Sequence, residues 1–132
     1  YALCAAQWHK ELSYKDKYLG NGIEVDKDFN KIFGYTPPYQ AAESAAALLV
    51  WKDAFERAGS TDTEKVRDAL AETDMQTFYG NIKFAETGQN IAKPMVLFQV
   101  RCEGDKCENR LVAPTKWASH ELVHPIPKWS ER

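Results

Sequence analysis

The apolar positions in the first part of the chain predict one strand and one helix. Residues 1–7 form a short apolar run bounded by polar residues, which is typical of a strand buried on both faces of a parallel sheet. After a polar stretch, apolar residues recur at helical spacing at four positions: Val25, Phe29, Ile32 and Phe33. Gly34 follows directly, so we expect it to end this amphipathic helix.

A longer helix is predicted from Pro37-Pro38 to about Ala58, because proline suits the first turn of a helix. Its first half, residues 41–51, is apolar almost all round, so we expect other structure to enclose it. Its second half narrows to one apolar stripe, which consists of Ala47, Trp51, Phe55 and Ala58. That stripe predicts a helix half that lies on a surface, and Gly59 is its expected C-cap.

A third helix and a strand follow. The sequence Thr-Asp-Thr-Glu at residues 61–64 predicts a capping box, and the inner face of the helix is expected at three residues: Val66, Ala69 and Leu70. From Phe78 to Phe84 apolar and polar residues alternate. This period of two predicts a strand.

The last third predicts a β-hairpin and a tail. Residues 95–101 and 110–113 are the expected strands, and Cys102 and Cys107 flank the Glu-Gly-Asp-Lys loop between them. Such a loop can bring the two Cα atoms near the ~5.5 Å of a disulfide, although two free thiols remain the alternative. Cys4 lies in an apolar run and is expected to be a small buried hydrophobe. The tail from residue 114 is predicted to be irregular, apart from a helical turn near residue 119.

Composition limits the class of protein. The chain has 132 residues, 44% of them hydrophobic, which is enough for one domain with a core. Its net charge of −2, with both signs interspersed, argues against a nucleic-acid partner. The chain opens at Tyr1 without Met or an apolar leader, which indicates a mature protein or, as we favour, an internal piece of a longer one.

The predicted elements do not close into an ordinary domain, because the first strand has no parallel neighbours and no βαβ repeat surrounds it. We therefore expect the missing strands to belong to a larger protein. If they are absent, apolar side chains of the first strand and the long helix need another cover, either the remainder of that protein or a second copy of the chain. The side chains expected to contact such a partner are Leu3, Ala46, Leu49 and Val50.

Four phrases identify a family when they are read together: Gly34 to Glu43, Arg57 to Ser60, Phe78 to Phe84, and Pro125 to Trp129. In this order and at these separations they resemble the carboxy-terminal part of type I periplasmic solute-binding proteins, the receptors of branched-chain amino acid and amide ABC importers. The resemblance implies an α/β fold, the C-terminal portion of a two-lobed structure with three helices, a crossing strand and a β-hairpin. It further implies that residues 1–20 and 90–132 are second-lobe elements and residues 21–89 first-lobe elements.

The resemblance also selects candidate ligand-binding residues. Gln7-Trp8 ends the first strand, and Tyr39, Gln40 and Glu43 begin the long helix; in these receptors both kinds of position face the cleft between the lobes. Glu43 can accept hydrogen bonds from an ammonium, Gln40 can donate or accept, and Trp8 or Tyr39 can form an aromatic wall. Structural interpretations are also open: Glu43 as a carboxylate in the first turn of the helix, Tyr39 as a hydrophobic staple, and Trp8 as a residue that packs the lobe. Many family members have Tyr where this chain has Ala45.

Metal binding and catalysis are not expected. His120 and His124 are four residues apart, a spacing that can hold a metal on a helix, but Pro125 follows and no third ligand is evident. Cys102 or Cys4 with His9 lacks any nucleophile signature. The sequence therefore predicts no metal, no cofactor and no enzymatic activity.

The function implied by the resemblance is that of the substrate-binding component of an ABC importer. Its expected partners are a small amino acid, amide or aromatic acid in an interlobe cleft and a membrane permease, and its expected location is the periplasm. The alternative is a cytoplasmic amide or amino-acid sensor of the same fold that acts in transcriptional regulation. A disulfide between Cys102 and Cys107 favours the periplasmic interpretation, because cytosolic thiols stay reduced.

Overall fold

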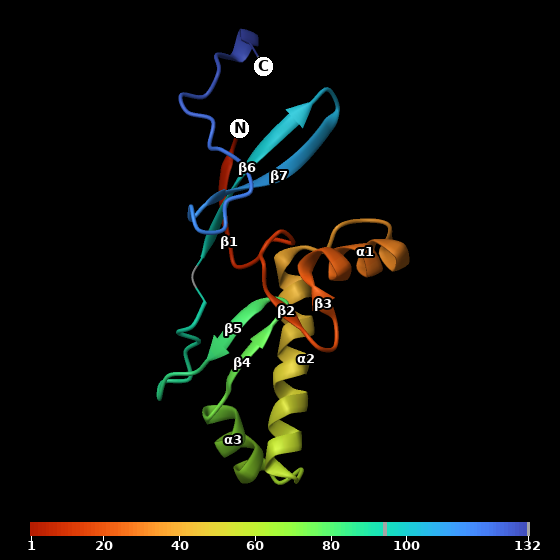
Figure 1. The fold of residues 1–132 in the computed structure, drawn as a ribbon, viewed down its shortest axis with the longest axis vertical. Helices are drawn as coiled ribbons and strands as arrows, with labels where there is room; N and C mark the ends of the chain where they lie inside the picture. The colour runs from red at the N-terminus through yellow and green to blue at the C-terminus, as the bar shows by residue number, and fades with distance from the viewer. Residues whose placement is uncertain (94, 132) are drawn as a thin grey trace.

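The computed structural model describes residues 1–93 and 95–131 and shows a mixed α/β chain. Figure 1 shows the longest strands at one end, near both termini, and the long helix with its partner helix at the other. The strands are β1 (Leu3–Ala6), β2 (Lys15–Asp16), β3 (Gly20–Asn21), β4 (Asp74–Thr77), β5 (Gly80–Lys83), β6 (Val96–Glu103) and β7 (Lys106–Ala113). The helices are α1 (Gly22–Phe33), α2 (Tyr39–Ala58), α3 (Thr63–Ala71) and a 3₁₀ turn at Trp129–Glu131.

Strand β1 is not the buried parallel strand that its apolar run predicted. It pairs antiparallel with β6, with Leu3 opposite Gln99 and Ala6 opposite Val96, in a sheet of order β1-β6-β7. Only Ala6 is buried in this strand, and Leu3 is 48% exposed. An apolar run looks the same in sequence whether its side chains are buried by the same chain or by another one. The pattern therefore could not predict whether this strand is parallel or antiparallel to its neighbour, or how far it is buried.

Helix α1 begins and ends at strong local signals. The Asn21 side chain accepts hydrogen bonds from the backbone N–H groups of Ile23 and Glu24, and the Glu24 carboxylate accepts the Asn21 N–H. This is a capping box that the sequence analysis missed. At the other end Gly34 has φ 81° and donates its N–H to Asn30 O, as predicted.

Helix α2 buries a different stripe from the one predicted for its second half. Its buried residues are Ala42, Ala46, Leu49, Val50 and Ala54. The predicted residues Trp51 and Phe55 are 46% and 41% exposed and stack on each other. Two apolar stripes run along this helix, and the one that contains Ala54 faces α3, where it packs with Val66 and Ala69. The expected end of the helix at Gly59 is confirmed.

Ala46, Leu49 and Val50 are covered by their own chain, so the prediction that they contact another chain is wrong. Leu3 is exposed, as is Leu48 on the opposite side of α2. In α3 the expected inner face is confirmed, since Val66 and Ala69 are buried. Its cap is Asp62, which accepts the Lys65 N–H, and the predicted capping box is absent because Lys65 occupies its third position.

The alternating segment from Phe78 to Phe84 is only partly a strand. Phe78 and Tyr79 form the turn between β4 and β5, and both side chains are buried instead of facing opposite sides. Asp16 holds the turn by accepting the Phe78 N–H at 2.8 Å. Gly80 begins β5 with φ 148°, a conformation that favours glycine, and a Cβ there would collide with the Lys93 side chain.

The hairpin of β6 and β7 is confirmed and is longer than predicted. Cys102 and Cys107 lie directly opposite each other, with Cα atoms 4.0 Å apart, and are joined by a disulfide. Gly104 opens the turn with φ 61°, as the first central residue of a type II′ turn requires. Cys4 is a free thiol. It was expected to be buried, but the structure leaves it half-buried.

The tail is irregular, as predicted. It runs beside Gln99, whose polar side chain is fully buried. Gln99 donates from Nε2 to Val123 O at 3.2 Å, and its Oε1 accepts the Val123 N–H at 3.0 Å. A hydrogen-bonded turn at Pro114 precedes Ser119. The larger of two buried clusters within the described residues joins the sheet, α2 and the β4–β5 turn: Ala6, Trp8, Leu12, Ala42, Ala46, Leu49, Phe78, Tyr79, Val96 and Leu111.

Candidate functional site

A cleft of about 650 Å³ opens between three parts of the chain. One wall is the segment from Trp8 to Glu11 that follows β1, and the second is Thr36 to Tyr39 at the start of α2. The third comes from Phe98 on β6 and residues 107–110 on β7. Segments far apart in the sequence therefore meet at one concave surface, which is the usual form of a small-molecule site.

Two of the four predicted ligand-binding residues, Trp8 and Tyr39, line the cleft. Trp8 lines the cleft but is only 4% exposed; its indole N–H donates to Phe78 O at 3.3 Å and its ring meets the Phe78 ring edge-on. Trp8 therefore packs the core as well as lining the cleft. Tyr39 is half-buried and lines the cleft from the start of α2.

Gln40 and Glu43 are not among the residues lining this cleft. Both are exposed, and Glu43 lies instead at the edge of a second, mainly apolar cavity of about 700 Å³ between α2, α3 and β5. The start of α2 points its first residues in different directions because successive helical positions turn by about 100°. The structure thus brings Trp8 and Tyr39 together and places Gln40 and Glu43 elsewhere.

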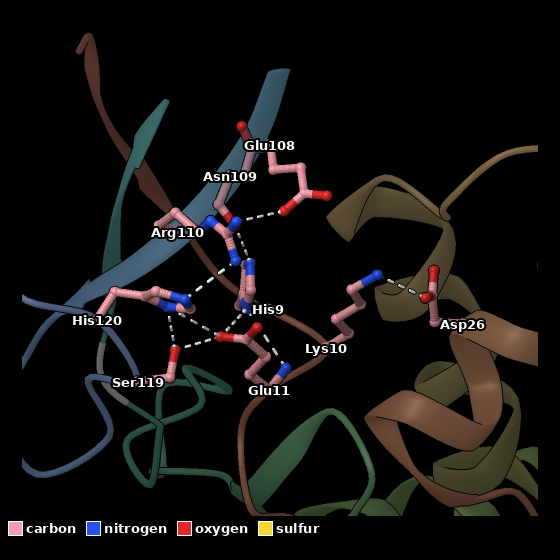
Figure 2. A network of polar contacts seen from close by, with 9 residues as sticks. All are labelled: His9, Lys10, Glu11, Asp26, Glu108, Asn109, Arg110, Ser119 and His120. Carbon is pink, nitrogen blue, oxygen red and sulfur yellow. Dashed lines mark hydrogen bonds and ion pairs between the residues drawn. The ribbon is translucent and has the colours of Figure 1, made fainter. Parts of the chain in front are cut away.

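The polar wall is organised by His9, whose ring is fixed at both nitrogens (Figure 2). Its Nδ1 accepts the Glu11 backbone N–H at 3.3 Å, so Nε2 carries the proton and donates to Asn109 O at 3.0 Å. Burial lowers the pKa of His9 below its ordinary value, against the opposing effects of that backbone hydrogen bond and of Glu11. His9 is therefore a neutral connector between the segment after β1 and strand β7.

Glu11 links the same wall to the tail. Its Oε2 accepts the Ser119 hydroxyl proton, and Ser119 Oγ lies 2.9 Å from His120 Nδ1. Arg110 donates to His120 Nε2 at 3.1 Å, which places the His120 proton on Nδ1 when this ring is neutral. Figure 2 shows these side chains in a continuous polar row.

The charges at the cleft are paired within the chain. Lys10 Nζ lies 2.7 Å from Asp26 Oδ2 on α1, and Arg110 lies 2.8 Å from Glu108 on the same strand. The cleft surface therefore presents alternating charges beside an apolar wall, with little net charge. Such a surface offers both donors and acceptors to a polar solute.

A second group of ionisable residues lies where the segment after β5 meets the turn between β4 and β5. Lys93 Nζ is 3.4 Å from the centre of the Tyr79 ring, is buried, and has no hydrogen-bond partner within the described residues. Burial lowers the pKa of Lys93 to about 8, although Glu43 acts in the opposite direction. Burial, followed by Glu43, raises the pKa of Tyr79. This group was missed because its members are separated in sequence and no short motif contains them.

The structure also tests the metal and catalytic interpretations. Within residues 1–93 and 95–131, no group of three or more His, Cys, Asp or Glu side chains has a geometry that could hold a metal ion. Cys102 is in a disulfide, so it is no free thiol nucleophile. Over the same residues, no helix combines the length and apolar character needed to cross a bilayer.

These features define a mixed α/β chain with a solute-sized cleft, and comparison with known proteins gives its family. A family model described as periplasmic binding protein matches residues 14–106. The chain therefore belongs to the periplasmic binding protein family, a family of binding proteins and not of enzymes.

A solved structure shares the fold. It is the crystal structure of a leucine binding protein, LivK, from Thermotoga maritima MSB8, with a TM-score of 0.64 and 22% sequence identity. The similarity covers 86% of this chain but only 31% of the LivK chain, so this chain spans about a third of the length of that protein. The expected α/β fold, part of a type I periplasmic binding protein, is thereby confirmed.

Proposed function

We propose that this chain forms part of a solute receptor of an ABC importer, and that the cleft between Trp8–Glu11, Thr36–Tyr39 and β7 holds part of the solute. The observation that carries the proposal is the origin of its walls. Thr36 to Tyr39 lie in the proposed first lobe, residues 21–89, whereas the other walls lie in the proposed second lobe, residues 1–20 and 90–132. Residues 94 and 132 of that range lie outside the described structure.

The cleft chemistry suits a small amino acid, amide or aromatic acid. Trp8, Phe98 and Tyr39 supply an aromatic wall, while the backbone of β7 and the paired charges of Lys10 and Arg110 supply polar contacts. Binding of this kind needs no covalent step. It requires only that the closed arrangement of the two lobes binds the solute more tightly than the open one.

The disulfide supports a periplasmic receptor over the alternative, a cytoplasmic sensor of the same fold. Cys102 and Cys107 are cross-linked at the end of the β6–β7 hairpin, and such cross-links persist in oxidising compartments such as the periplasm. In that compartment the partner of a solute receptor is a membrane permease.

Isothermal titration of the receptor that contains this chain, with a panel of amino acids, amides and aromatic acids, tests the proposal. For the solute that binds, Tyr39→Ala should weaken affinity by about tenfold, the loss of one good aromatic contact. Tyr35→Ala is the matched control, because Tyr35 is exposed and contacts Phe29 and Phe33 outside the cleft. Equal affinities for the two variants would show that the cleft is not the solute site.

A further inference from the structure

One polar cluster at the rim of the cleft joins three segments of the chain. We call it the His9 clasp and define it as His9, Glu11, the Asn109 carbonyl, Ser119 and His120. Its contacts connect the segment after β1 to strand β7 and to the tail. His9 and Glu11 also line the cleft, so the clasp fixes the position of one cleft wall.

The clasp requires a neutral His9. The Glu11 N–H points at His9 Nδ1, and this contact at 3.3 Å exists only while Nδ1 keeps its lone pair. An imidazolium carries a proton on both nitrogens. It can still donate from Nε2 to Asn109 O, but on the other side two N–H groups would face each other.

The charged groups around His9 have opposing effects on the protonation of its ring. Glu11 Oε2, at 3.8 Å from Nδ1, favours the protonated ring, whereas Lys10 and His120 disfavour it. Arg110 on β7 adds positive charge that Glu108 offsets at 2.8 Å, and Asp26 on α1 offsets Lys10. The Phe98 ring on β6, which carries no charge, also lies beside His9. Burial is the largest influence and keeps the ring neutral near pH 7.

We propose that the His9 clasp is an acid-sensitive lock: a proton taken from solvent by His9 Nδ1 releases the Glu11 N–H and frees the cleft wall at residues 9–11 from its fixed position. The Glu11 carboxylate then turns toward the imidazolium. The imidazolium and the Ser119 hydroxyl compete for Glu11 Oε2. The tail contact at Ser119 is loosened as a result. Acid therefore opens the rim of the cleft while the core around Trp8 stays folded.

The experiment uses the full chain without any solute, so its result does not depend on the proposed function. Long-range ¹H–¹⁵N spectra of the labelled chain follow His9 protonation from pH 8 to 4.5, and amide exchange, corrected for intrinsic rates, is measured over the same range. As His9 becomes protonated, the protection factor of the Glu11 amide should fall by about fivefold or more, the effect of losing one hydrogen bond. Ala54, fully buried on α2, should stay protected at least a hundredfold more than Glu11.

Two variants complete the test. In His9→Gln the side chain does not titrate, so Glu11 protection should be independent of pH; His124→Gln, outside the clasp, should behave as the unaltered chain does. Glu11 protection that survives His9 protonation, loss of protection at Glu11 and Ala54 together, or a His9 ring still neutral at pH 4.5 would overturn the proposal. If His9→Gln does not fold, the unaltered chain and His124→Gln still decide the question.

Discussion

Trp8 belongs to both the core and the cleft, and a stability measurement tests its role in the core. Trp8→Ala should lower the free energy of unfolding by about 3–5 kcal/mol, because it empties a buried site beside Phe78 and removes the hydrogen bond to its carbonyl. Trp51→Ala, which truncates an exposed ring, should cost less than about 1 kcal/mol. Urea unfolding followed by circular dichroism measures both. Similar losses in the two variants would contradict the burial of Trp8.

Lys93 predicts a rise of stability with alkaline pH. Its pKa is about 8 in the folded chain and about 10.4 when unfolded, so the unfolded chain binds more protons between these values. The free energy of unfolding should therefore increase from pH 8 to pH 10.5, by about 1–2 kcal/mol because the side chain keeps some contact with water. In Lys93→Met this increase should be absent. The comparison is made by urea titration at each pH, and parallel curves for the two chains would refute the assignment to Lys93.

At this scale the sequence could predict residue types at the cleft but not their partners. Trp8 and Tyr39 were expected there because strand ends and helix starts of this fold face the cleft. The Asn109 carbonyl that His9 contacts lies 100 residues away on β7, and Glu11 links the same cluster to His120 in the tail. Which strand passes beside His9 is decided by long-range pairing, and no local pattern encodes it.

Among the elements, α1 offers a clean test of local signals. Asn21→Ala removes the side chain that accepts two backbone N–H groups and should lower the free energy of unfolding by about 1 kcal/mol. Asn30→Ala on the same helix is the matched control; Asn30 is exposed in the helix interior, where alanine is the better helix former. Thermal unfolding of both variants measures the difference. A control that loses as much as Asn21→Ala would show that capping is not the cause.

The three helices were predictable because periodicity and caps act within a few residues. The failures occurred where two local signals competed or where distant contacts decided the outcome. Phe78 to Phe84 alternates as a strand does, yet Asp16, some sixty residues earlier, holds Phe78 in a turn. On α2 two apolar stripes were available, and packing against α3 selected the one that contains Ala54.

For the molecule as a whole, apolar surface remains uncovered within the described residues. Leu48, Trp51 and Phe55 are exposed along α2, and Trp51 also lines the apolar cavity of about 700 Å³ that α2 shares with α3 and β5. We predict that the chain self-associates at micromolar concentration, because contiguous apolar surface of this kind is unfavourable in water. Sedimentation velocity should then show species heavier than 15.0 kDa.

A variant pair locates that association. Trp51→Lys should shift the distribution toward the monomer, since it places a charge in the middle of the apolar surface, whereas Glu72→Lys, an exposed polar position beyond α3, should leave it unchanged. Monomers in all three samples would mean that this surface is tolerated. Addition of the remaining part of the proposed receptor should also disperse the self-associated species if that part covers the same surface.

The core that runs from Trp8 to Phe78 has a mechanical consequence. Elements of both proposed lobes contribute to it, so these lobes cannot separate at this point without exposing the buried rings of Trp8 and Phe78. The hinge axis of any rotation that opens or closes the cleft must therefore lie close to this contact. Displacements are then smallest at Trp8 and grow with distance from it. The tip of the β6–β7 hairpin should therefore move further than the residues around Trp8.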